Sequence, residues 1–118
     1  MIAVIFEVEP AKGRFDSYLD FAARLRPLLE QTDGFISVER FQSISDPKRI
    51  VSLSFWRDED AVAAWRNTAE HRAAQKAGRN GIFAGYRLRI GHIVRDYGMD
   101  RREEAPPDSR QVNDVTSF

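Results

Sequence analysis

Hydrophobic and polar residues alternate in four segments of the chain, and this period of two predicts β-strands. The segments are residues 2–9, 35–44, 49–56 and 86–97. In the first segment both faces are apolar at the start and only one at the end, which is typical of a central strand leaving the core. Asp46 and Pro47 separate the second and third segments and predict the turn of a hairpin.

Apolar residues three and four positions apart predict amphipathic helices between these strands. Residues 14–31 carry one such stripe, in which Pro27 predicts a kink or an irregular last turn. Gly34 follows it and is expected to form a left-handed helix cap. A second helix is expected to begin after Asp58, whose carboxylate can accept hydrogen bonds from the free N–H groups of a helix start.

Trp65 and His71 lie on this second helical segment, and an unbroken helix would place them roughly 240° apart around its axis. Thr68 is a capping residue, so we predict that one helix ends near Asn67 and another begins at Thr68. The break would let Trp65 border the same cavity as His71 and Gln75. On the second piece, Arg72, Lys76 and Arg79 are expected to point outward.

The resulting order β, α, β, β, α, β predicts an α+β fold, in which a ferredoxin-like four-stranded antiparallel sheet carries both helices on one face. Val51, Leu53 and Phe55 would then lie on the other face with no helical layer above them. We therefore expect a homodimer packed sheet to sheet. Residues 1–98 form the expected domain, and residues 99–118 a charged tail that is mobile unless it docks.

Composition excludes several classes of function. The chain has 18 basic and 18 acidic residues and no evidently basic face, so we do not expect a nucleic-acid partner. It has no cysteine, and its two histidines are far apart in sequence, so neither thiolate chemistry nor a metal site is expected. We see no signal peptide and no run approaching the roughly 18 apolar residues of a membrane span, and expect a cytoplasmic protein with no membrane partner.

Each candidate site residue also has a purely structural explanation. Trp65 can anchor the core, and His71 can sit on the surface or bond to backbone. Amides near helix ends, such as Asn67 and Gln75, often satisfy local backbone groups. Arg87 lies on a strand, where arginines often form solvated or cross-strand pairs. The residues alone leave both explanations open.

Four stretches resemble a known family: "DGFISVERFQS", "SFWRDEDAVAAWRN", "EHRAAQKAGR" and "YRLRIGHIVRDYG". They are similar to the antibiotic biosynthesis monooxygenase family of dimeric α/β barrel proteins, and the likeness covers about residues 1–98. The resemblance implies a homodimer with one pocket per subunit between sheet and helices. In some members this pocket oxidises quinols or aromatic polyketides with O2 and without metal or flavin, and in others it binds and degrades haem.

The haem-degrading branch has an asparagine on the first strand, a tryptophan on the second helix and a histidine ten positions after that tryptophan. Here Trp65 matches, but the other two positions hold Phe6 and Gln75. Glutamine is not a usable iron ligand in place of histidine, so the sequence disfavours haem degradation.

The cofactor-independent branch implies a small aromatic phenol or quinol and O2 as reactants, and no cofactor. Such a substrate must lose a proton before it reacts with O2, so the site needs a base near neutral pH and a dry cavity. We assign catalytic roles to His71 as base and to Trp65, Asn67 and Arg87, and substrate binding to Phe6, Gln75 and Phe83. The alternative is a binding or stress-response module in which the same cavity holds an apolar aromatic without chemistry.

Overall fold

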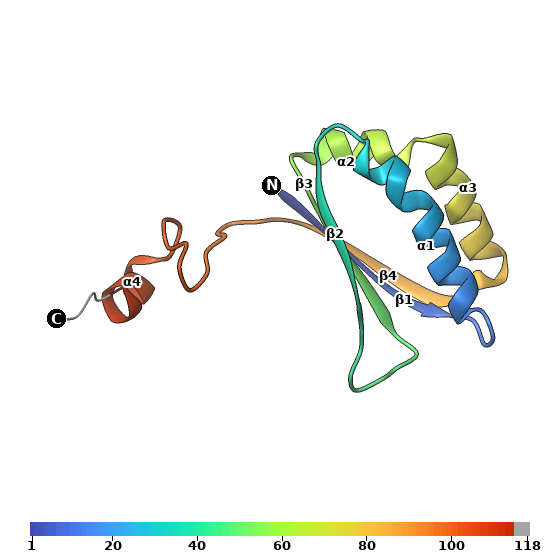
Figure 1. Ribbon diagram of the computed structural model, residues 1–118, viewed down its shortest axis with the longest axis horizontal. Coiled ribbons are helices and arrows are strands. Elements are labelled where there is room, and N and C mark those ends of the chain that lie inside the picture. The colour runs from blue at the N-terminus through green and yellow to red at the C-terminus, as the bar shows by residue number, and fades with distance from the viewer. Residues whose placement is uncertain (115–118) are drawn as a thin grey trace.

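A computed structural model describes residues 1–114 and confirms the predicted fold. Its elements are β1 (Ile2–Pro10), α1 (Phe15–Glu30), β2 (Phe35–Gln42), β3 (Ile50–Trp56), α2 (Glu59–Arg66), α3 (Ala69–Ala77), η1 (Gly78–Ile82), β4 (Phe83–His92) and α4 (Pro107–Asn113). The sheet has the order β2-β3-β1-β4, and each neighbouring pair is antiparallel. Figure 1 shows α1, α2 and α3 on one side of this sheet.

The strand register determines which side chains face the helices. Ile2 and Val8 of β1 lie opposite Trp56 and Ile50 of β3, and all four are buried beneath the helices. The core next to α2 contains Ile2, Leu29, Val38, Trp56, Ala61, Val62 and Trp65. Burial of these apolar groups is the main force that holds the helices on the sheet.

Several strand ends differ from the sequence prediction. β4 covers Phe83–His92 rather than residues 86–97, because it can extend only where β1 pairs with it. The Ile93 N–H still bonds the Met1 carbonyl (3.0 Å), but β1 offers no partner beyond that point. The hairpin strands end at Gln42 and begin again at Ile50, so the loop is longer than expected, although the Arg49 N–H closes the predicted turn onto Asp46 (2.9 Å).

Gly34 is left-handed as predicted (φ +86°), but it does not cap α1. The helix continues through Pro27 and ends at Glu30, and Gln31 is its capping residue. Gly34 is needed instead for a close approach, since a Cβ added there would lie 2.5 Å from the Cβ of Ala61 on α2. Its carbonyl also accepts the Arg57 N–H (2.7 Å), so this turn sets the distance between α2 and the start of β2.

The other face of the sheet carries Val51, Leu53 and Phe55, each only partly buried. No helix of residues 1–114 covers that face, and the pairing of two copies through it stays a prediction. In the described part of the chain, no helix is both long and apolar enough to cross a membrane.

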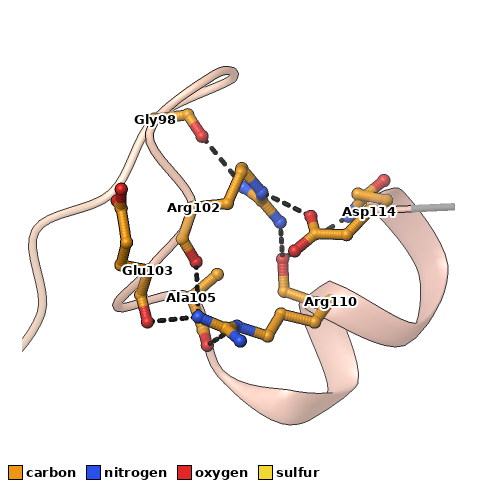
Figure 2. A network of polar contacts seen from close by, with 8 residues as sticks. Gly98, Arg102, Glu103, Ala105, Arg110 and Asp114 are labelled. Carbon is orange, nitrogen blue, oxygen red and sulfur yellow. Dashed lines mark hydrogen bonds and ion pairs between the residues drawn. The ribbon is translucent and has the colours of Figure 1, made fainter. Parts of the chain in front are cut away.

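After β4 the chain extends away from the sheet and folds into a small unit around α4 (Figure 1). Figure 2 shows Arg102 at its centre, donating to Asp114 (2.6 Å), to Ser109 (2.8 Å) and to the Gly98 carbonyl (3.1 Å). Arg110 donates to backbone carbonyls of residues 102, 103 and 105. The sequence did not predict this helix, and the expected domain boundary at residue 98 stays a prediction.

We predict that Gly34→Ala lowers the free energy of unfolding by about 2–5 kcal/mol, because it combines a left-handed backbone with a clash against Ala61. Gly13→Ala is the matched control, since Gly13 is also left-handed (φ +78°) but has no neighbour within 4 Å of an added Cβ. That variant should lose only the backbone cost of about 1–2 kcal/mol. Urea unfolding of both variants measures the difference, and equal losses would refute the close-packing argument.

Candidate functional site

The helical segment after β3 is broken where the sequence predicts it. Asp58 caps α2 and accepts the Ala61 N–H (2.8 Å), and α2 ends at Arg66. Thr68 caps α3, its hydroxyl accepting the His71 N–H (3.2 Å) and donating to the Trp65 carbonyl (2.9 Å). One side chain therefore ties the end of α2 to the start of α3.

This break places Trp65 and His71 side by side. Their ring centroids are 5.3 Å apart and the ring planes are inclined by 58°. Trp65 is 8% exposed and also belongs to the core, so the structural and functional explanations of this residue both apply. His71 is half-buried. An indole and an imidazole thus share one wall of the space between helices and sheet.

That space is a cavity of about 410 Å³. The sheet supplies its floor, with Val4, Phe6, Val38, Arg40, Ser52, Ser54, Trp56, Phe83, Tyr86, Leu88 and Ile90. The helices and η1 supply the opposite wall, with Tyr18, Phe21, Ala22, Leu25, Leu29, Val62, Trp65, Arg66, His71, Arg72, Ala74, Gln75, Arg79 and Ile82. The lining is mostly apolar and aromatic, as expected of a site for a small organic molecule.

Five of the seven candidate residues from the sequence line this cavity: Phe6, Trp65, His71, Gln75 and Phe83. Phe6 and Phe83 also contact each other edge to face, with centroids 5.7 Å apart. Gly78 makes room for this floor, because a Cβ added there would lie 2.3 Å from the ring of Phe83. The roles assigned to these five residues stay predictions.

The other two candidates lie elsewhere. The amide of Asn67 is occupied in ending α2, since it donates to the Ala63 carbonyl (2.9 Å) and accepts from Arg72 (2.6 Å). Arg87 faces the opposite side of the sheet, beside Glu7 and Arg89. Successive strand residues point to opposite faces, so Arg87 cannot share the floor with its neighbours Tyr86 and Leu88. Neither Asn67 nor Arg87 lines the cavity.

His71 is held in its neutral form. Its pKa lies below the ordinary histidine value because burial disfavours the imidazolium ion, and the charges of Arg72 and Arg66 lower the pKa further. Its Nδ1 atom is buried and has no hydrogen-bond partner within residues 1–114. Protein atoms shield this nitrogen, whereas Nε2 is neither shielded in this way nor hydrogen-bonded within residues 1–114. Because His71 lines the cavity, Nε2 is the ring nitrogen that a ligand there can reach.

Sequence reasoning missed four arginines in the lining: Arg40, Arg66, Arg72 and Arg79. Arg72 and Arg79 are exposed, as expected, but part of each side chain also lines the cavity. α3 has no buried residue, so side chains flanking its inner stripe can reach the cavity with their long stems. For Arg40 a signal existed, since it follows the buried Val38 by two positions on the same strand.

The described residues contain no group of three or more histidine, cysteine, aspartate or glutamate side chains placed to hold a metal ion. The position that the haem-degrading branch uses for its iron ligand is Gln75 here, and it does line the cavity. An amide is not a suitable ligand for haem iron, so the residues present do not fit haem at that position.

Comparisons with known proteins agree with this geometry. The family model described as antibiotic biosynthesis monooxygenase matches residues 1–77. A protein of Pyricularia oryzae named "Jasmonate monooxygenase ABM" is 47% identical over 120 residues, which cover 99% of this chain and 55% of that protein. The chain therefore spans little more than half the length of that relative. An uncharacterised protein of Bacillus subtilis is 32% identical over 94 residues, covering 79% of each.

Solved structures share the fold at low sequence identity. A protein of Mycobacterium tuberculosis superimposes with a TM-score of 0.74 at 12% identity, covering 82% of this chain and 98% of that one. A structure described as an antibiotic biosynthesis monooxygenase gives a TM-score of 0.70 at 17% identity, covering 80% and 99%. These likenesses concern the fold alone.

We predict that Thr68→Val lowers the free energy of unfolding by about 1–2 kcal/mol, because it keeps the shape of the side chain but loses both capping hydrogen bonds. Thr68→Ser keeps the hydroxyl and is expected to stay within about 0.5 kcal/mol of the parent. Urea unfolding followed by circular dichroism compares the two variants. A Val variant as stable as the Ser variant would mean that the hydroxyl does not maintain the break.

Proposed function

Because the chain belongs to the antibiotic biosynthesis monooxygenase family, we propose that it is a monooxygenase that oxidises a small organic molecule with O2 in the cavity beside Trp65. The substrate we propose is a phenol- or quinol-type ring compound, and no cofactor takes part. The observation that carries the proposal is the half-buried His71 ring, which lines a mostly apolar cavity beside Trp65 and leaves its Nε2 atom accessible. The name of the Pyricularia relative makes jasmonate a second candidate substrate.

His71 acts as the general base in this proposal. A base must be neutral before it accepts a proton, and the low pKa of His71 keeps it neutral at physiological pH. Removal of a proton from the phenol, or from a carbon next to the ring, leaves an electron-rich anion that reacts with O2. The apolar walls exclude water from this anion.

The reaction balances without an external reductant. For an anthrone-type methylene the overall change is R₂CH₂ + O₂ → R₂C=O + H₂O. The carbanion forms a C–O bond with O2, and the peroxide oxygen takes the proton back from His71. Loss of the second C–H proton then breaks the O–O bond, forming the carbonyl group and releasing water, so the substrate supplies all the electrons.

The developing negative charge needs donors in the cavity. Asn67 and Arg87 were the sequence candidates for this role, but they lie outside the lining. We propose Arg72 and Arg66 instead, because their charges act on His71 and both residues line the cavity. Asn67 then acts as a positioning residue, holding the Arg72 guanidinium through its amide oxygen (2.6 Å).

We predict that His71→Gln lowers kcat for the oxidation of an anthrone or quinol by about 10²–10⁴-fold, because glutamine can form hydrogen bonds but cannot act as the base. The measurement is protein-dependent O2 uptake above the autoxidation rate, with His92→Gln as the control because His92 is exposed at the end of β4. An active His71→Gln variant would exclude His71 as the base.

Tight binding without O2 uptake by the parent protein would favour the binding module, and a Soret shift with hemin would favour haem binding.

The pH dependence gives a separate prediction. His71 should titrate below its ordinary value of about 6.5, and removing the charge of a neighbouring cation should raise its pKa. Arg72→Met is therefore expected to move the titration of His71, and the acid limb of kcat/KM, to higher pH. ¹H NMR follows the two histidine ring signals, which the His71→Gln and His92→Gln variants assign. An unchanged or lower pKa in Arg72→Met would contradict the electrostatic account.

A further inference from the structure

The lining of the cavity is unusually positive for this chain. The sequence has equal numbers of basic and acidic residues, yet four arginines and no aspartate or glutamate of the described residues line the cavity. The arginines are Arg40, Arg66, Arg72 and Arg79. An excess of positive charge around a mostly apolar cavity creates an electrostatic potential that attracts an anionic ligand.

In the described part of the chain, five arginines outside the cavity form ion pairs with carboxylates: Arg26, Arg49, Arg57, Arg89 and Arg102. Arg49 and Arg89 both bond to Glu7, at 2.9 and 2.7 Å, and Arg57 bonds to Asp33 at 3.1 Å. Within residues 1–114, none of the four cavity arginines forms an ion pair. Within the described residues, the side-chain hydrogen bonds of Arg72 go to the amides of Asn67 (2.6 Å) and Gln75 (3.5 Å). Arg66, Arg72 and Arg79 are exposed, so water and salt screen their charges, and Arg40 is the one of the four that is partly buried.

Arg40 is the most informative of the four. It lies on β2 opposite Ser52, and its side chain is part of the floor beneath the helices. Its Nε atom is buried and has no hydrogen-bond partner in the described part of the chain. This nitrogen is shielded by protein atoms, whereas the Arg40 Nη atoms are neither shielded in this way nor hydrogen-bonded within residues 1–114. A ligand in the cavity that satisfies these charged donors gains binding energy.

A carboxylate fits these donors best. The two Nη groups of the guanidinium present N–H donors in one plane that match the two oxygens of a carboxylate, whereas a phenol or amide oxygen satisfies only part of them. The remaining lining includes Phe21, Leu25 and Trp65, which suit a ring or hydrocarbon body. The complementary ligand is thus apolar over most of its surface and carries one carboxylate.

We propose that the cavity selects amphipathic carboxylic acids and that Arg40 binds their carboxylate group. This deepens the proposed function and rests on it in using the same cavity, since it adds that the ring compound oxidised there carries a carboxylate group. Arg66, Arg72 and Arg79 contribute a general positive potential, and Arg40 contributes the directed, two-point contact.

The test compares a carboxylate with a neutral molecule of the same shape. 6-Phenylhexanoate and its primary amide are titrated into the full chain without O2, and binding is followed by calorimetry. We expect the acid to bind at least tenfold more tightly than the amide. In Arg40→Met the two affinities should agree within about twofold, because the neutral side chain keeps its length and loses the guanidinium group. Arg79→Met is the matched control and should retain at least a threefold preference for the acid.

Several results would overturn the proposal. These are no measurable binding of the acid, equal affinities for acid and amide in the parent protein, or an acid preference that persists in Arg40→Met. A preference that Arg79→Met removes and Arg40→Met leaves intact would assign the carboxylate to the helical side instead. Thermal unfolding checks that Arg40→Met is folded.

The proposal and the proposed function can fail separately. The phenylhexanoate titration involves no oxidation, so a clear acid preference in a protein that consumes no O2 would refute the monooxygenase and leave carboxylate binding intact. Conversely, O2 uptake that depends on His71 but shows no preference for acids would refute only the role of Arg40.

Discussion

The site depends on the interruption between α2 and α3. A continuous helix would turn His71 away from Trp65, and the break brings the two rings to 5.3 Å. Thr68 holds this geometry with one hydroxyl that serves as acceptor for α3 and as donor to the last turn of α2. Both hydrogen bonds satisfy backbone groups that any helix end leaves without a partner, so the break costs little stability. It places one site residue on each side, Trp65 on α2 and His71 on α3.

Much of the fold could be predicted from the sequence, because it follows from the local preferences of the residues. Alternation predicted the four strands, and Asp58 and Thr68 marked both helix starts before any contact was known. Strand ends were less predictable, because a strand ends where its partner ends. β4 ends near His92 because its partner strand β1 begins next to Met1. The sequence around residues 86–97 contains no signal of where β1 begins.

The site was harder to predict from the sequence than the fold, because it depends on which face of the sheet each side chain points to. The alternation of Tyr86, Leu88 and Ile90 already placed Arg87 on the other face, so its assignment to the cavity was avoidable. Arg40 is different, because the register of β2 shifts between Phe35 and Ser37. The extra residue in this bulge lets Arg40 share a face with Phe35, which strict alternation forbids. Alternation counted from Val38 gives the correct face for Arg40, whereas alternation counted from Phe35 gives the wrong one, because the bulge depends on pairing with β3.

The cavity cations and the neutral base are physically coupled. Arg72 and Arg66 lower the pKa of His71, so the same charges that keep the base ready to accept a proton also make it a weaker base. If the cavity binds a carboxylate as proposed, the added negative charge opposes the arginines and raises the pKa of His71 in the complex. Linkage requires the reverse effect as well, so protonation of His71 would strengthen binding of the acid. An anionic substrate would then increase the basicity of His71 only while it occupies the cavity, which restricts proton abstraction to the complex in which a substrate is present to react.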